Sequence, residues 1–261
     1  MDWARHRRRK AAAKLHLRLN VQSFLPSFAI VDTAAHNDNK RARELCAGLH
    51  EGKIAVFDRA YVDFKHLCDL AKRGIFWVTR AKQGMKCRCV KRLIKKREGN
   101  ILRDDLIVLS GQNTKSHYPE VLRRVRALVE VDGKEREMEF LTNNLEWIAS
   151  SIVALYKCRW RIEVFFKETK QTLQLCDFLG HNKNAVQWQV WTALLLYVLL
   201  RYQAFVHRWQ HGFKRFFCLL RSSVWDGIRV ESLAKLYGTA GGIPSMRAAV
   251  DQLYLPGLKR I

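Results

Sequence analysis

Two apolar runs, Lys53-Ile-Ala-Val-Phe57 and Ile75-Phe-Trp-Val-Thr79, decide the fold of this chain. Each run is continuous rather than alternating, which is typical of a strand buried on both faces of a sheet. The residues between them, Val62 to Arg73, have a helical pattern that Gly74 ends. A strand, a helix and a second strand in this order predict an α/β domain, in which Asp58 directly follows the first strand.

The residues before this unit predict further strands. Ala13 to Asn20 alternates as a strand, and Phe24 to Asp32 is expected to pair with it as a hairpin. Asn39 to Leu49 has the pattern of a helix. The order of the first eighty residues is therefore β-β-α-β-α-β.

The pattern changes from about Lys82 onward. Four alternating segments, separated by turn residues, predict an antiparallel β insertion: Cys87 to Ile94, Ile101 to Leu109, Leu122 to Val131 and Glu135 to Leu141. The following segment, Glu146 to about Leu175, is expected to be helical, and Ala185 to Trp209 is an apolar helix rich in tryptophan. The remainder is helical but weakly patterned.

The composition points to a polyanionic partner. The chain of 261 residues has 47 Lys and Arg against 24 Asp and Glu, a net charge of +23, and 48% hydrophobic residues. A folded chain this basic favours nucleic acid first and an anionic membrane surface second. The most apolar stretch, Ala193 to Leu200, is interpreted as a buried helix too short to span a bilayer, so we expect no membrane partner.

The seven cysteines form no C-x-x-C pair, which favours free thiols in a reducing cytoplasm. We therefore expect a cytoplasmic protein. Cys87 and Cys89 are interpreted as alternating thiols on a strand rather than as part of a metal site.

One segment carries the chemistry: Tyr156-Lys-Cys-Arg-Trp-Arg-Ile-Glu-Val-Phe-Phe-Lys-Glu-Thr-Lys170. In one continuous helix, Tyr156, Arg159, Glu163 and Lys170 fall within about 60° of one another. A carboxylate can hold a hard divalent cation, and the cations beside it can hold phosphates, an arrangement that suits phosphodiester chemistry. The alternative is an ordinary surface ion pair between Arg159 and Glu163.

The spacing resembles the Y-x2-R-x3-E-x6-K signature of a large family of bacterial insertion-sequence DDE transposases, the IS-four family. Ala55-Val-Phe-Asp58-Arg-Ala-Tyr61 resembles the second-Asp motif of this family, an apolar strand ending in D-R-G-Y, with Ala60 in place of glycine. The resemblance covers about residues 10 to 210.

The resemblance implies an RNase H-like α/β fold with a β insertion between the second and third catalytic carboxylates. It implies cleavage and strand transfer at transposon ends, with two Mg²⁺ (or Mn²⁺) ions held by Asp58 and Glu163. Tyr156, Arg159 and Lys170 would contact DNA phosphates. The expected partners are double-stranded DNA of the ends and target, and a second copy on DNA by analogy.

The corresponding domains are the N-terminal part of the catalytic domain (1–82), the β insertion (83–145), the helices carrying the Glu (146–210) and a helical tail (211–261). The strand with the first catalytic Asp is expected to be missing, which would leave neighbouring strands with unpaired edges and make the chain inactive. Asp2, in a connection, and Asp32, in a turn and capping segment, are weaker substitutes.

Other features favour less specific interpretations. The basic run from Arg5 to Lys14 is either a solvated loop or a non-specific DNA contact. Trp188 and Trp191 are expected to pack in the core rather than stack on bases, and phosphate contact by His181 to Asn184 is not favoured. The competing functions are a non-catalytic basic DNA-binding remnant, and an unrelated nucleic-acid-binding protein with an accidental match.

Overall fold

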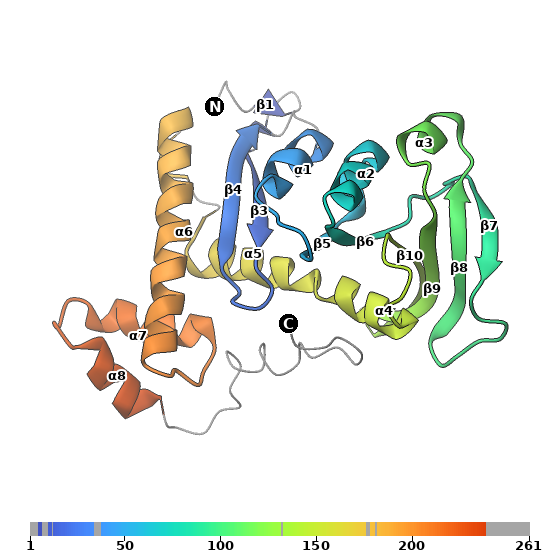
Figure 1. Ribbon diagram of the computed structural model, residues 1–261. Coiled ribbons are helices and arrows are strands. Elements are labelled where there is room, and N and C mark those ends of the chain that lie inside the picture. Colours follow the sequence, from blue (N-terminus) through green and yellow to red (C-terminus); the bar gives the residue numbers. More distant parts are fainter. Residues whose placement is uncertain are drawn as a thin grey trace. The chain divides into compact units, whose positions relative to one another are not determined.

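The computed structural model describes residues 5–6, 10–11, 13–33, 38–131, 133–175, 178–180 and 182–238 (Figure 1). These residues form two compact units. Unit 1 comprises the described residues of 5–33 and 161–238, and unit 2 comprises those of 38–160. The domain boundaries expected above remain predictions.

Unit 2 is built on a six-stranded mixed sheet with the strand order β5-β6-β10-β9-β8-β7. Its strands are β5 (Ile54–Phe57), β6 (Phe76–Arg80), β7 (Cys87–Arg92), β8 (Ile101–Leu109), β9 (Leu122–Val131) and β10 (Lys134–Thr142). β5 and β6 are parallel, and every other neighbouring pair is antiparallel. The expected α/β class and mixed sheet are confirmed. The strands of the β insertion extend the β5–β6 sheet, because Leu141 of β10 lies opposite Thr79 of β6.

Helices cover both faces of this sheet. Unit 2 contains α1 (Asp38–Cys46), the 3-10 turn η2 (Arg59–Tyr61), α2 (Phe64–Lys72), α3 (Gln112–His117) and α4 (Ala149–Lys157). Trp77 belongs to a core cluster with residues of α2, whereas its neighbour Val78 packs in a second cluster with residues of α4. Successive side chains of a strand point to opposite faces, which explains why the run from Ile75 to Thr79 is continuously apolar.

Unit 1 combines short antiparallel strand pairs with helices. Its elements are β1 (Arg5–His6), β2 (Lys10–Ala11), β3 (Ala13–Leu19), β4 (Pro26–Thr33), α5 (Trp160–Thr172, in this unit from residue 161), α6 (Lys183–Val206), α7 (Phe213–Ser223) and α8 (Val230–Tyr237). β3 and β4 form the expected hairpin, with Leu17 opposite Ala29. An isolated hairpin is marginal in water. Leu17 packs in one core cluster with Val190 and Tyr197 of α6, and this packing stabilises the hairpin.

The prediction of a single helix from Glu146 to Leu175 is wrong, because the helix is interrupted between α4 and α5. The N–H of Arg159 donates to the carbonyl of Tyr156 at 3.0 Å, and the N–H of Cys158 is shared between the carbonyls of Ala154 and Leu155. These shorter-range bonds tighten and end the first helix. Tyr156 and Glu163 therefore do not share the face of one continuous helix.

The apolar helix α6, Lys183–Val206, has nearly the length of the helix expected from Ala185 to Trp209. Its 24 residues are long and apolar enough to cross a membrane by length and composition, with a mean hydropathy of 1.2 over an 18-residue window. One such helix is weak evidence for a membrane span, because the core helix of a soluble protein passes the same test. About a third of that window, 33%, is buried inside the protein. α6 thus has one face in the core of unit 1 and another outside it.

The six cysteines within the described part of the chain are not in disulfides, in agreement with the expectation of thiols. The expectation for the tryptophans of α6 is wrong, because Trp188 is 74% exposed and Trp191 is 47% exposed. These two side chains lie on the outer face of α6 rather than in the core.

Candidate active site

Asp58 lies where strand β5 ends. Its carboxylate caps the 3-10 turn η2 and accepts a hydrogen bond from the N–H of Arg59 at 2.5 Å. The side chain is 51% exposed. Asp58 therefore has one oxygen held by the backbone while half of its surface remains accessible to a ligand.

A hollow surrounds this carboxylate. Because β5 and β6 are parallel, their carboxyl ends meet at one edge of the sheet, the usual place for ligands in α/β sheets. The hollow is open and is lined by Asp58, Arg59, Ala60, Lys82 and Gln83. Lys82 is held there, because its Nζ donates to the carbonyl of Val62 at 2.7 Å. Lys82 was not among the residues predicted from the sequence, although its position just after the second parallel strand was a usable signal.

Arg159 is the charge partner of Asp58. Its Nη1 lies 3.8 Å from Oδ2 of Asp58, and its side chain is 20% exposed. Its guanidinium also lies over the ring of Tyr156, at 5.6 Å from the ring centroid. A partly exposed pair of this kind contributes at most about 1 kcal/mol to stability. The pair therefore matters for the charge of the site rather than for stability, because it places a cation beside the carboxylate of Asp58.

Tyr156 anchors this arrangement in the core of unit 2. Its ring is 7% exposed and packs against Phe140 with the centroids 5.0 Å apart. Burial raises the pKa of the Tyr156 hydroxyl, and Arg159 acts in the opposite direction. The hydroxyl therefore stays protonated at neutral pH, as a hydrogen-bond donor.

Helix α5 carries the other two predicted site residues. Glu163 is partly buried and Lys170 is exposed. Seven residues apart, they lie on one face of the helix. The Nζ of Lys170 lies 5.7 Å from the ring centroid of Phe166. On the opposite side Phe165 is fully buried, which fixes the orientation of the helix in unit 1.

An ion pair between Arg201 and Glu168, which was not predicted from the sequence, connects α6 with α5. Arg201 donates to Glu168 at 2.8 Å and to the hydroxyl of Tyr197 at 2.9 Å. Burial raises the pKa of Glu168, while Arg201 opposes this effect. A lone arginine within an apolar helix was the available signal, since a buried cation needs a partner.

The structure thus brings Asp58, Tyr156 and Arg159 together in unit 2 and places Glu163 and Lys170 in unit 1. Within the described residues, no group of three or more His, Cys, Asp or Glu side chains has a metal-binding arrangement. Asp32 is buried in β4, at 7% exposure. Asp2 and His181 lie outside the described residues.

Comparison with known proteins gives a consistent result. Residues 2–199 match the family model described as the transposase DDE domain. A Sinorhizobium fredii protein named as transposase y4zB is 34% identical over 209 residues, which cover 79% of this chain and 57% of that protein. A protein of Geobacillus stearothermophilus, named as a transposase for insertion sequence element IS5377, is 26% identical over 77% of this chain and 52% of its own length. Transposase InsG of element IS4 from Escherichia coli K12 is 25% identical over 73% of this chain and 43% of its own length.

The fold, the placement of Asp58 and the family match define a chain that belongs to the DDE transposase family. Its relatives named above include transposases of insertion-sequence elements, the group whose signature Tyr156, Arg159, Glu163 and Lys170 resemble. The chain spans about half the length of the curated relatives that it matches.

Proposed function

We propose that this chain contributes to metal-dependent cleavage and strand transfer of double-stranded DNA at the ends of an insertion sequence. The observation that carries the proposal is Asp58, a half-exposed carboxylate at the carboxyl end of a parallel strand, beside an open hollow and a guanidinium. Asp58 and Glu163 form the carboxylate pair in this proposal.

The donor chemistry of the two residues fits Mg²⁺ or Mn²⁺, because both offer carboxylate oxygens, the ligands that hard cations prefer. When bound, two such ions activate the attacking oxygen and stabilise the leaving oxygen of a phosphodiester. The local structure of this chain orients both carboxylates. The N–H of Arg59 donates to Asp58, and Glu163 lies on a helix that the fully buried Phe165 holds in the core of unit 1.

Arg159 and Lys170 would bind the phosphates of the strand being cut. The guanidinium of Arg159 pairs with Asp58 in the structure and presents donors that match phosphate oxygens. The ring of Tyr156 packs against the guanidinium of Arg159, and the hydroxyl of Tyr156 stays protonated. In this proposal Tyr156 is a positioning residue for Arg159 and a donor to the phosphate.

We further propose that the chain alone does not cleave DNA and needs a third carboxylate. One observation on the sheet of unit 2 supports this. The outer edge of β5 pairs with no other strand in the described part of the chain.

The experiment measures Mn²⁺ binding and plasmid nicking on the purified chain, so that the site is tested even where cleavage is absent. Mn²⁺ binding followed by electron paramagnetic resonance is expected to weaken at least tenfold in Asp58→Asn and in Glu163→Gln, since each loses a charged ligand. The matched control Asp226→Asn removes an exposed acid outside the site and is expected to change nothing.

Two outcomes would contradict the proposal. Equal Mn²⁺ binding by all variants would remove the carboxylate pair, leaving a non-catalytic DNA-binding function. Nicking by the wild-type chain with Mg²⁺ that is abolished by Glu163→Gln would support the chemistry but overturn the proposed need for a third carboxylate.

A further inference from the structure

The outer face of α6 carries an apolar stripe that nothing in the proposed chemistry uses. We call it the α6 stripe. It consists of six side chains that are each 47% to 74% exposed: Trp188, Trp191, Leu195, Leu199, Tyr202 and Val206. At 3.6 residues per turn these positions lie within an arc of about 80° and extend about 27 Å along the helix. The stripe is therefore a ridge of large apolar side chains along α6; Figure 1 shows the course of this helix.

The stripe is also free of charge, in a chain with a net charge of +23. The charged residues of α6 are Lys183, in its first turn, and Arg201, whose side chain is 14% exposed and pairs with Glu168. A helix that binds a membrane surface or DNA has cations beside its contact face. The absence of cations here favours a protein partner, since two copies could meet without repulsion between like charges.

The arrangement of the stripe is symmetric about the level of Tyr197. Leu195 and Leu199 lie two residues to either side of that level, and the aromatic side chains of Trp191 and Tyr202 lie farther out on opposite sides. When two copies of the helix pack antiparallel about a two-fold axis, Leu195 of one faces Leu199 of the other, and Trp191 faces Tyr202. A surface with this property is self-complementary, as an isologous interface requires.

The area is sufficient for a dimer. The stripe, together with Leu196 and Phe205 at its margins, offers on the order of 900 Å² of exposed surface per copy when large side chains are weighted by their exposed fractions. A standard protein interface covers about 800 Å² on each partner. Large uncharged patches of this size on a soluble surface mark interaction sites.

We propose that α6 is a homodimer interface, in which the α6 stripes of two copies of this chain pack antiparallel about a two-fold axis. This interface does not depend on the proposed metal chemistry, because it uses neither Asp58 nor Glu163. It gives the chain a partner of defined chemistry: a second copy, bound through an apolar surface in the absence of DNA.

Sedimentation equilibrium of the purified chain over a range of concentrations tests the interface. The wild-type chain is expected to reach a dimer, with twice the 30.5 kDa mass of one chain. Leu195→Lys is expected to weaken the dimer at least tenfold, because each copy then buries a cation within the apolar interface, close to the two-fold axis. Leu236→Lys, at a 70% exposed leucine on α8, is the matched control and is expected to leave the dimer intact.

A pair of double variants tests the antiparallel packing. Leu195→Glu with Leu199→Lys places opposite charges face to face, whereas Leu195→Lys with Leu199→Lys places like charges there. Both lose the same apolar surface, so the first is expected to dimerise at least about tenfold more tightly, since like charges across an interface are strongly unfavourable.

Three results would overturn the proposal. They are a wild-type chain that stays monomeric at every concentration, a Leu195→Lys variant that dimerises like the wild type, and equal affinity of the two double variants. Co-sedimentation of the wild-type chain with phosphatidylcholine vesicles, lost in Leu195→Lys, would also overturn it by assigning the stripe to lipid.

Discussion

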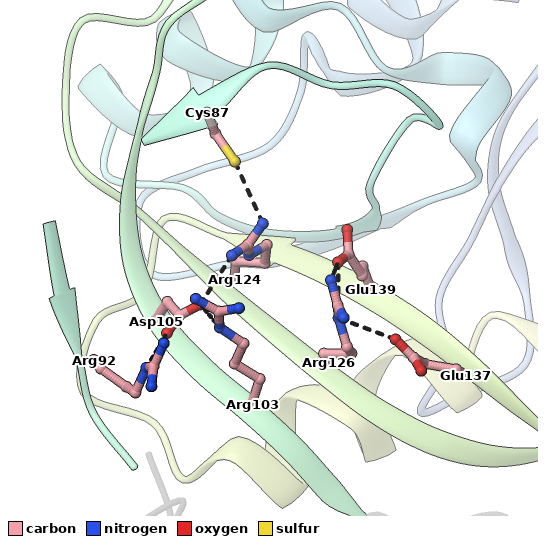
Figure 2. A network of polar contacts seen from close by, with 8 residues as sticks. All are labelled: Cys87, Arg92, Arg103, Asp105, Arg124, Arg126, Glu137 and Glu139. Carbon is pink, nitrogen blue, oxygen red and sulfur yellow. Dashed lines mark hydrogen bonds and ion pairs between the residues drawn. The ribbon is translucent and has the colours of Figure 1, made fainter. Parts of the chain in front are cut away.

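Asp105 shows how single residues hold the sheet of unit 2 together. Its side chain is fully buried and forms ion pairs with Arg103 at 2.6 Å, Arg124 at 2.9 Å and Arg92 at 3.8 Å (Figure 2). The three arginines come from three neighbouring strands, β8, β9 and β7. One carboxylate therefore offsets part of the repulsion among three cations that lie close together in the sheet.

Asp105→Asn is expected to lower the free energy of unfolding by about 3 kcal/mol. Removing one partner of a buried pair typically costs 3 to 5 kcal/mol, and the partial exposure of Arg92 and Arg103 favours the lower end. Urea denaturation measures the loss. Glu137→Gln is the control, because this 50% exposed partner of Arg126 is expected to cost less than about 1 kcal/mol. Equal losses in the two variants would contradict this account.

His66 gives the chain a pH dependence of stability. Its side chain is 4% exposed, and its ring packs edge-on against Phe57 at 6.2 Å. Burial, followed by the charge of Arg43, lowers the pKa of His66 below its ordinary 6.5. The unfolded chain therefore binds a proton more readily than the folded chain.

It follows that the stability contributed by neutral His66 is complete above pH 6.5 and is lost as the pH falls from 6.5 through the folded pKa. The slope cannot exceed about 1.4 kcal/mol per pH unit for one group. Urea denaturation at pH 7.5, 6.5 and 5.5 measures it, and His66→Phe is expected to reduce the dependence. An unchanged pH profile in that variant would show that His66 is not the responsible group.

At the scale of elements, the periodicity of the sequence predicted most strands and helices, because burial imposes a period of two or of 3.6 on apolar residues. The break at Cys158 and Arg159 could not be predicted, since neither glycine nor proline stands there. It matters for the candidate site, because it turns the predicted single helical face of Tyr156 and Glu163 into two separate elements.

The orientation of α6 also could not be predicted. The helix is apolar on the face toward Val190 and Leu194, which are buried, and on the face of Trp188 and Leu195, which are exposed. A helix that is apolar all round normally indicates complete burial. The position of Asp58 at the end of β5, by contrast, was predictable. The apolar run of a strand that is buried on both faces ends where the chain leaves the sheet, and Asp58 is the first polar residue after it.

Asn143 extends the pairing of β6 beyond the end of β10. Its Oδ1 accepts from the N–H of Trp77 at 2.9 Å, and its Nδ2 donates to the carbonyl of Ile75 at 3.0 Å. Asn143→Asp is expected to cost about 1 to 3 kcal/mol, because a carboxylate cannot donate to that carbonyl. Thermal unfolding measures the loss. Asn100→Asp, whose exposed amide donates to Leu128, is expected to cost less, and a larger loss there would contradict the argument.

At the scale of the whole molecule, the excess of cations is unevenly distributed. The segment Lys86 to Arg97 contains seven lysines and arginines and no acidic residue, and all seven side chains are exposed. It includes β7, which is an edge strand of the six-stranded sheet. Lysines on an edge strand prevent association with other sheets, and they also attract phosphates.

Binding of the chain to double-stranded DNA is therefore expected to weaken steeply with salt, and Lys95→Gln with Lys96→Gln is expected to lower the slope of log affinity against log salt concentration by about 1.8. Each lost phosphate contact removes about 0.9 from this slope, because one condensed counterion is no longer released. Fluorescence anisotropy over a salt series gives the slopes. Lys65→Gln with Lys72→Gln removes the same charge from the exposed side of α2 and separates a local contact from the effect of net charge. If both double variants lower the slope equally, the basic segment acts through the overall charge alone, since a general field does not distinguish the position of the cations.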